Sequence, residues 1–183
     1  MITLPTLFAA GVLLTATLPT VAAQESLSEE VLAHTHTEFS FTAHASFERT
    51  APLFGADEER KWAPDWNPKF IYPVPAHDQQ GMIFQVAHGE LTSTWVNTAF
   101  DLSGGHFQYA YVLANTMVTL IDIHLTRDGQ HKTSVNVVYE RTALSPEANE
   151  HVRHFAKGDQ KAEAEWEKQI NGYFEKLRAA DQK

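Results

Sequence analysis

Hydrophobic and polar residues alternate over residues 33–44, where Phe39 and Phe41 fall on one side of the segment and His36 and Glu38 on the other. This period of two is typical of a β-strand with one buried face. Six further extended runs follow, separated by turn-forming segments, at 69–75, 82–88, 91–101, 106–113, 117–126 and 131–142. Because the connections between these six runs are short, we expect each of them to pair antiparallel with the next in sequence.

The helical signals lie on either side of these runs. Ser46 is placed to cap a short helix that Gly55 ends, and a second short helix runs from Asp57 to Trp62. From residue 145 onward, apolar side chains recur every three or four residues and form one stripe. Gly158-Asp159 is expected to interrupt this long helical stretch. Its second part, residues 160–178, would be about 28 Å long at 1.5 Å per residue.

One hairpin can be assigned a register from its pattern. A two-residue Asp128-Gly129 turn would place the apolar Ile123 opposite the polar Ser134. A three-residue loop of residues 127–129, with Gly129 in the left-handed position, instead places Ile121 opposite Val135. We therefore predict the three-residue loop.

The first 23 residues have the pattern of a secretory signal peptide. They carry no charged side chain, and an apolar run at 7–14 leads to small residues around Ala23, where cleavage is expected. The alternatives are a misassigned start and an uncleaved anchor, although the apolar run is short for a membrane span of about 20 residues. We expect an exported protein, periplasmic or secreted, whose single domain spans residues 30–180.

Composition excludes several classes of function. The chain has 183 residues, a formal net charge of −9 and no cysteine. Phosphate backbones and anionic lipids would repel such a chain, so nucleic-acid binding and a stable membrane anchor are not expected. The lack of cysteine rules out disulfides, cysteine zinc sites and cysteine nucleophiles.

Short motifs accompany this order of elements, at Pro52-Leu53-Phe54, 58–68, Phe70-Ile71-Tyr72-Pro73, Ser93-Thr94-Trp95-Val96, Thr142-Ala143-Leu144-Ser145 and Ala164-Glu165-Trp166-Glu167. On these residues the chain resembles the START/SRPBCC superfamily, which includes polyketide cyclases/dehydrases and lipid-transport proteins. The resemblance implies an α+β helix-grip fold, in which a curved seven-stranded antiparallel sheet wraps around a long C-terminal helix, with two short helices after the first strand. It also implies a cavity for an apolar small molecule between sheet and helix.

The aromatic residues supply most of the candidates for lining such a cavity. Tyrosine and tryptophan suit it because they combine a large apolar area with one polar tip. The alternative is a solid aromatic core, and Trp62 and Trp66 in particular fit an entrance wall and ordinary core packing equally well. The predicted ligand-binding residues are Trp62, Trp66, Tyr72, Trp95, Asn97, Phe107, Tyr109, Tyr111, Phe155, Trp166, Ile170 and Tyr173.

Histidine pairs raise the question of a metal. His34 and His36, and likewise His151 and His154, have spacings that could chelate zinc or copper, but no carboxylate follows at ligand spacing. Asp122 and His124 alternate on one strand like a catalytic dyad, on a face otherwise typical of solvated sheet surface. Glu58 and Glu59 are interpreted as solvated helix surface. We predict that the protein binds no metal ion and no cofactor, and we assign no catalytic residue.

The sequence favours a protein that binds, or binds and transports, a hydrophobic or amphipathic small molecule without covalent chemistry. The alternative is a cyclase or dehydratase-like enzyme in which Asn97, Tyr109 or a buried histidine polarises a substrate carbonyl. A third reading, a partner-binding domain, fits poorly with export. An enzyme should place at least one ionisable group with a perturbed pKa inside the cavity, whereas a carrier should place almost none.

Overall fold

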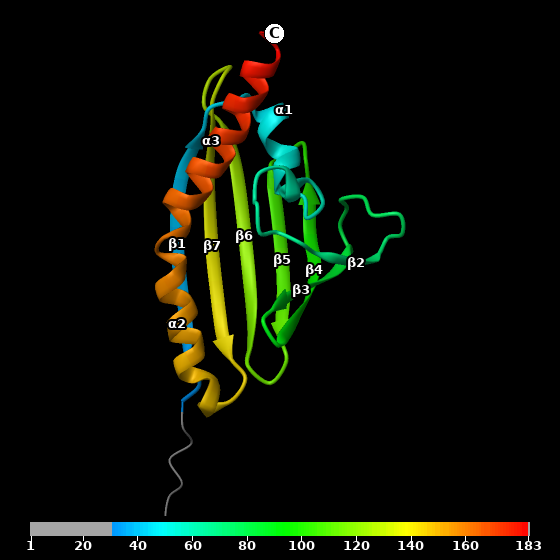
Figure 1. The fold of residues 1–183 in the computed structure, drawn as a ribbon. Helices are drawn as coiled ribbons and strands as arrows, with labels where there is room; N and C mark the ends of the chain where they lie inside the picture. Colours follow the sequence, from blue (N-terminus) through cyan, green and yellow to red (C-terminus); the bar gives the residue numbers. More distant parts are fainter. Residues whose placement is uncertain (1–30, 183) are drawn as a thin grey trace, which may run out of the picture.

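The computed structural model describes residues 31–182, so the predicted signal peptide lies outside the described residues. Seven antiparallel strands form one sheet in the order β1-β7-β6-β5-β4-β3-β2 (Figure 1). Their bounds follow the predicted runs closely: β1 His34–Ala43, β2 Lys69–Tyr72, β3 Ile83–His88, β4 Leu91–Asp101, β5 His106–Leu113, β6 Met117–Arg127 and β7 Thr133–Ala143.

The helices occupy the two predicted regions. After β1 come α1 (Phe47–Thr50) and two 3₁₀ turns, η1 (Ala51–Phe54) and η2 (Glu58–Lys61). A 3₁₀ turn, η3 (Pro146–Ala148), leads into α2 (Asn149–Asp159), which is separated from α3 (Ala162–Ala180) at the predicted interruption. The two long helices follow one another along β1 (Figure 1). No helix within residues 31–182 has the length and hydropathy needed to cross a membrane.

Two buried asparagines fasten these helices to the ends of β1. Oδ1 of Asn149, at the start of α2, accepts the backbone N–H of Ala33 at 2.6 Å. Asn171, in the middle of α3, accepts the N–H of His44 at 2.7 Å and donates to the carbonyl of Thr42 at 2.9 Å. The strand ends therefore satisfy their backbone groups through the helices, which fixes the helices over one face of the sheet.

That face, here called the inner face, carries the core. Along β5 and β6 burial alternates, so that Phe107, Ile121 and Ile123 point inward while His106 and Asp122 point to the opposite, outer face. The inward set joins Phe54 of η1 and Ile170 and Phe174 of α3 in one continuous hydrophobic cluster. Five of the predicted ligand-binding residues share this face, namely Trp95, Asn97, Phe107, Tyr109 and Tyr111.

The predicted register of the β6–β7 hairpin is wrong. Val135 lies opposite Leu125, and Ile121 lies opposite Tyr139, so the loop spans the five residues 128–132. Tertiary contacts at the strand ends explain the longer pairing. Arg127 packs over the Phe47 ring at 3.9 Å, and the hydroxyl of Thr133 donates to the carbonyl of Ala45 at 3.0 Å. Apolar residues still face one another, because the register changed by an even number of residues.

Candidate functional site

A cavity of about 270 Å³ lies between the inner face of the sheet, the short helices and α3. Its volume is just below the range of about 300–1,000 Å³ that is usual for small-molecule sites. Every strand from β3 to β7 contributes to its wall. The lining residues are Phe54, Glu59, Trp66, Phe84, His88, Trp95, Tyr109, Tyr111, Ile121, Ile123, Tyr139, Arg141 and Trp166.

The wall is built from aromatic rings that pack on one another. Trp95 stacks on Tyr111 with ring centroids 4.2 Å apart, and on Phe84 at 5.5 Å. The edge of Trp66 meets Trp95 at 5.5 Å, and Trp166 meets Phe54 at 6.3 Å. Such contacts hold each ring in place without a ligand, so the cavity is formed in advance.

Several of these rings already donate their N–H or O–H group to a hydrogen-bond acceptor within the protein. The indole N–H of Trp66 donates to the carbonyl of Ala56 at 2.7 Å, and the hydroxyl of Tyr109 donates to the carbonyl of Phe54 at 2.6 Å. Burial raises the pKa of Tyr109 well above its ordinary value, so this phenol stays neutral. These rings therefore offer the cavity mainly apolar surface.

Glu59 is the exception, because its carboxyl group has no hydrogen-bond donor within residues 31–182. Burial, together with the nearby charge of Asp78, raises the pKa of Glu59 to about 8. The carboxyl group is therefore mostly protonated at pH 7. A neutral carboxylic acid facing an apolar cavity can donate a hydrogen bond to a carbonyl or ether oxygen of a ligand.

Asp78 holds the turn that carries Glu59. Its carboxylate accepts the backbone N–H groups of Asp57 at 2.9 Å and Glu58 at 3.2 Å. Gly55 leaves room for it, because a Cβ at that position would lie 2.2 Å from Oδ2 of Asp78. Burial nevertheless raises the pKa of Asp78.

A second polar group in the wall is the guanidinium of Arg141 on β7, whose charge is paired and whose hydrogen bonds are made within the protein. Its Nε and Nη2 atoms donate to the two carboxylate oxygens of Asp159, the last residue of α2, both at 2.7 Å. Nη1 donates to the hydroxyls of Tyr111 and Thr119. The guanidinium also lies 4.8 Å from the centroid of the Tyr139 ring. Arg141 thus joins helix to sheet and leaves little donor capacity for an anionic ligand.

His88, at the end of β3, is a further ionisable side chain in the wall. Its Nε2 lies 2.8 Å from Oγ of Ser93. Burial and the charge of Arg141 lower the pKa of His88, which favours the neutral imidazole at pH 7.

Five of the predicted residues line the cavity: Trp66, Trp95, Tyr109, Tyr111 and Trp166. Of the two tryptophans that fit both an entrance wall and the core, Trp66 lines the cavity. Trp62 is core, because its N–H donates to the carbonyl of Leu53 at 2.7 Å and its ring packs against Trp166 at 5.5 Å.

The other six predicted residues lie outside the cavity wall. Phe107 and Ile170 are completely buried in the core. The carboxamide of Asn97 lies against backbone carbonyls where β4 departs from regular pairing. Phe155 covers the guanidinium of Arg141 at 5.3 Å. Tyr173 packs on Phe174, and Tyr72 is 55% exposed because it sits on the edge strand β2.

Sequence reasoning missed eight lining residues. The strand pattern placed Ile121, Ile123 and Tyr139 inward but did not distinguish cavity wall from core. The interpretation of Glu59 as solvated helix surface is wrong. In the tight turn η2, Glu58 points outward to the ammonium group of Lys61 while Glu59 points inward. Two adjacent acidic residues in a sequence do not indicate which side chain will point outward and which inward.

Within residues 31–182, histidine and acidic side chains come together in a geometry suited to a metal at His106, Asp122 and His124. This group lies on the outer face, away from the cavity.

A scan against protein-family models and a search of curated proteins gave no match. Solved structures do match. Norcoclaurine synthase from Thalictrum flavum, in complex with dopamine and hydroxybenzaldehyde, has a TM-score of 0.59 at 12% identity over 88% of this chain and 98% of that one. The Zhui aromatase/cyclase from Streptomyces sp. R1128 has a TM-score of 0.60 at 14% identity, over 81% of this chain and 98% of that one. Ara h 8.0201 has a TM-score of 0.52 at 14% identity, over 77% of this chain and 97% of that one. These likenesses show the fold of the chain, which is the helix-grip fold that the sequence resemblance implies.

Proposed function

We propose that this protein binds a small hydrophobic or amphipathic molecule in the cavity between sheet and helix. The observation that carries the proposal is a preformed cavity of about 270 Å³ whose wall is mostly aromatic and aliphatic. Burying apolar ligand surface there gains about 25 cal/mol per Å², and the fixed rings need little reordering.

The cavity also restricts the kind of ligand. Its volume suits a compact molecule of one or two fused rings rather than a long-chain lipid. Glu59 supplies one hydrogen-bond donor, whereas the compensated Arg141 offers little to an anion. A neutral ring compound with one acceptor oxygen fits these conditions. A structural neighbour with two small aromatic molecules bound, dopamine and hydroxybenzaldehyde, supports this choice.

Binding can be tested with 2-tetralone, a fused-ring ketone, by quenching of tryptophan fluorescence. Ile121 lines the cavity, so Ile121→Phe fills part of it and should weaken binding at least about tenfold, since overpacked sites accept little extra volume. Leu120, its neighbour on β6, is 42% exposed on the outer face. Leu120→Phe is therefore the matched control, expected to leave the Kd within about twofold. Equal loss in both variants, or no saturable quenching, would contradict the proposal.

A cyclase or dehydratase-like activity is the second candidate, favoured by the ionisable groups in the wall. A neutral carboxyl group at Glu59 and a neutral imidazole at His88 are the forms needed for a general acid and a general base. Exchange of the α-protons of 2-tetralone in D₂O, followed by NMR, measures such chemistry. We expect Glu59→Gln and His88→Gln each to lower the rate at least about tenfold while binding persists. A wild-type rate equal to that of buffer would eliminate this candidate.

Export forms the last part of the proposal and rests on the first 23 residues alone. N-terminal sequencing of protein recovered outside the cytoplasm should begin at Gln24. An intact Met1 on that protein would refute cleavage.

A further inference from the structure

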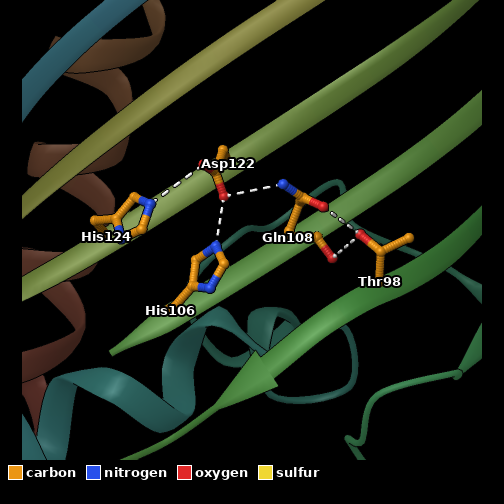
Figure 2. A network of polar contacts seen from close by, with 5 residues as sticks. All are labelled: Thr98, His106, Gln108, Asp122 and His124. Atoms are coloured by element: carbon orange, nitrogen blue, oxygen red, sulfur yellow. Dashed lines mark hydrogen bonds and ion pairs between the residues drawn. The ribbon is translucent and has the colours of Figure 1, made fainter. Parts of the chain in front are cut away.

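Four side chains of β5 and β6 come together on the outer face of the sheet (Figure 2). The register places His106 opposite His124 and Gln108 opposite Asp122. Since neighbouring side chains alternate between faces, these four point away from Phe107, Ile121 and Ile123, which are buried on the inner face. The cluster is therefore separated from the cavity by the thickness of the sheet.

The two imidazoles converge on one carboxylate. Nε2 of His106 lies 2.7 Å from Oδ1 of Asp122, and Nε2 of His124 lies 3.2 Å from Oδ2 (Figure 2). The rings are parallel within 5°, with centroids 4.4 Å apart. One ligating atom from each of the three residues lies within 4.8 Å of the other two.

Neighbouring polar groups hold Asp122 in this position. Nε2 of Gln108 donates to Oδ1 of Asp122 at 3.4 Å, and the hydroxyl of Thr98 on β4 donates to the side-chain oxygen of Gln108 at 2.9 Å. Such outer contacts are what orients ligands in metal sites. These contacts hold the carboxylate of Asp122 between the two imidazoles.

We propose that His106, Asp122 and His124 bind a divalent transition-metal ion of the zinc and copper class. Two imidazole nitrogens and one carboxylate oxygen are ligands that these ions prefer, with bonds of about 2.0–2.2 Å to zinc. Small side-chain rotations bring the three ligands to that distance, because their atoms already converge. The side chains are 37%, 32% and 51% exposed, so water can enter as the fourth ligand.

The pair that the sequence suggested for metal binding differs in geometry. His34 and His36 also contact one carboxylate, that of Glu140, at 2.9 and 2.6 Å. His36 approaches through Nδ1 and His34 through Nε2, and within residues 31–182 these atoms do not form a group as compact as the cluster on β5 and β6. This pair is a natural control.

The test is a calorimetric titration of the protein with ZnCl₂. We expect one equivalent to bind with a Kd of about 10 µM or tighter, and His106→Ala, His124→Ala and Asp122→Asn each to weaken it at least about tenfold. The double variant His34→Ala/His36→Ala should retain the wild-type Kd. Thermal melts without zinc check that each variant is folded, which the surface position of the cluster favours.

Two outcomes would overturn the proposal. One is a zinc Kd of the wild-type protein weaker than about 1 mM. The other is binding that survives the double variant His106→Ala/His124→Ala. Because the cluster and the cavity lie on opposite faces, Ile121→Phe should leave zinc binding unchanged. Failure here is thus distinguishable from failure of the ligand-binding proposal.

Discussion

Glu59→Gln should stabilise the protein at alkaline pH and leave its stability unchanged near pH 4. Glutamine has the size of a protonated glutamate but cannot ionise. In the wild-type protein, burial and the charge of Asp78 raise the pKa of Glu59 to about 8, whereas a glutamate in the unfolded chain ionises near pH 4.5. Removing the ionisable group therefore removes the cost of charging it inside the fold.

The direction of the pH dependence follows from proton binding. Between about pH 4.5 and pH 8 the folded protein holds a proton on Glu59 that the unfolded chain has released, so the wild-type free energy of unfolding falls as pH rises. At 1.36 kcal/mol per pKa unit, the loss is ~3 kcal/mol at pH 7 and up to ~5 kcal/mol above pH 9. Urea unfolding at pH 4.5, 7 and 8.5 measures it, and Glu59→Gln should flatten the difference.

Glu58→Gln is the matched control for this experiment. Glu58 belongs to the same 3₁₀ turn, but its carboxylate pairs with Lys61 at the surface. Losing an exposed ion pair changes stability by less than about 1 kcal/mol, and the pH dependence should remain that of the wild-type protein. If both variants respond alike, or if Glu59→Gln is destabilising at pH 8.5, Glu59 does not face the cavity as an unpaired acid.

Glu59 lowers the free energy of unfolding at neutral pH, and this cost suggests that its carboxyl group has a role in the cavity. Proteins accept such costs mainly where activity needs a strained or unpaired group. The stability measurement therefore also bears on function. A ligand that accepts a hydrogen bond from Glu59 binds its protonated form, so it should stabilise the protein fully below about pH 8 and progressively less above that pH.

The strands, and the pairing of β2 through β7 in sequence order, could be predicted because local pattern and fold agree along most of the chain. The alternation over residues 33–44 and the apolar positions of β6 gave the buried face, and Gly158-Asp159 marked the break between α2 and α3. The β6–β7 loop could not be predicted, since contacts of Arg127 and Thr133 with the α1 region select its length. Turn chemistry alone carries no information about those distant partners.

The site was only partly predictable for the same reason. Trp95 and Tyr111 follow from strand period and aromatic chemistry. In contrast, Glu59 depends on which way one 3₁₀ turn faces, and the zinc-binding proposal depends on His106 meeting His124 across two strands. Asp122 and His124 were visible as a pair in sequence, but the third ligand becomes a neighbour only through the β5–β6 register.

The other large expected effect concerns the ion pair between β7 and α2. Arg141→Met should destabilise the protein by about 3–5 kcal/mol, because it leaves the carboxylate of Asp159 buried without its partner. Urea unfolding measures the loss. Arg153→Met is the control, since Arg153 forms an exposed pair with Glu150 on α2 and its replacement should cost less than about 1 kcal/mol.

The double variant Arg141→Met/Asp159→Leu separates the net contribution of the ion pair to stability from the penalty of leaving one buried charge unpaired. Replacing both partners by apolar side chains removes the buried charge, so most of the lost stability should return. Asp159 also ends α2, where the negative end of the helix dipole opposes a carboxylate, and its removal relieves that repulsion. If the double variant is as unstable as Arg141→Met, the loss comes from the hydrogen bonds to Tyr111 and Thr119 and from packing around the guanidinium. If it recovers, this ion pair mainly fixes how α2 meets the sheet beside the cavity and adds little net stability.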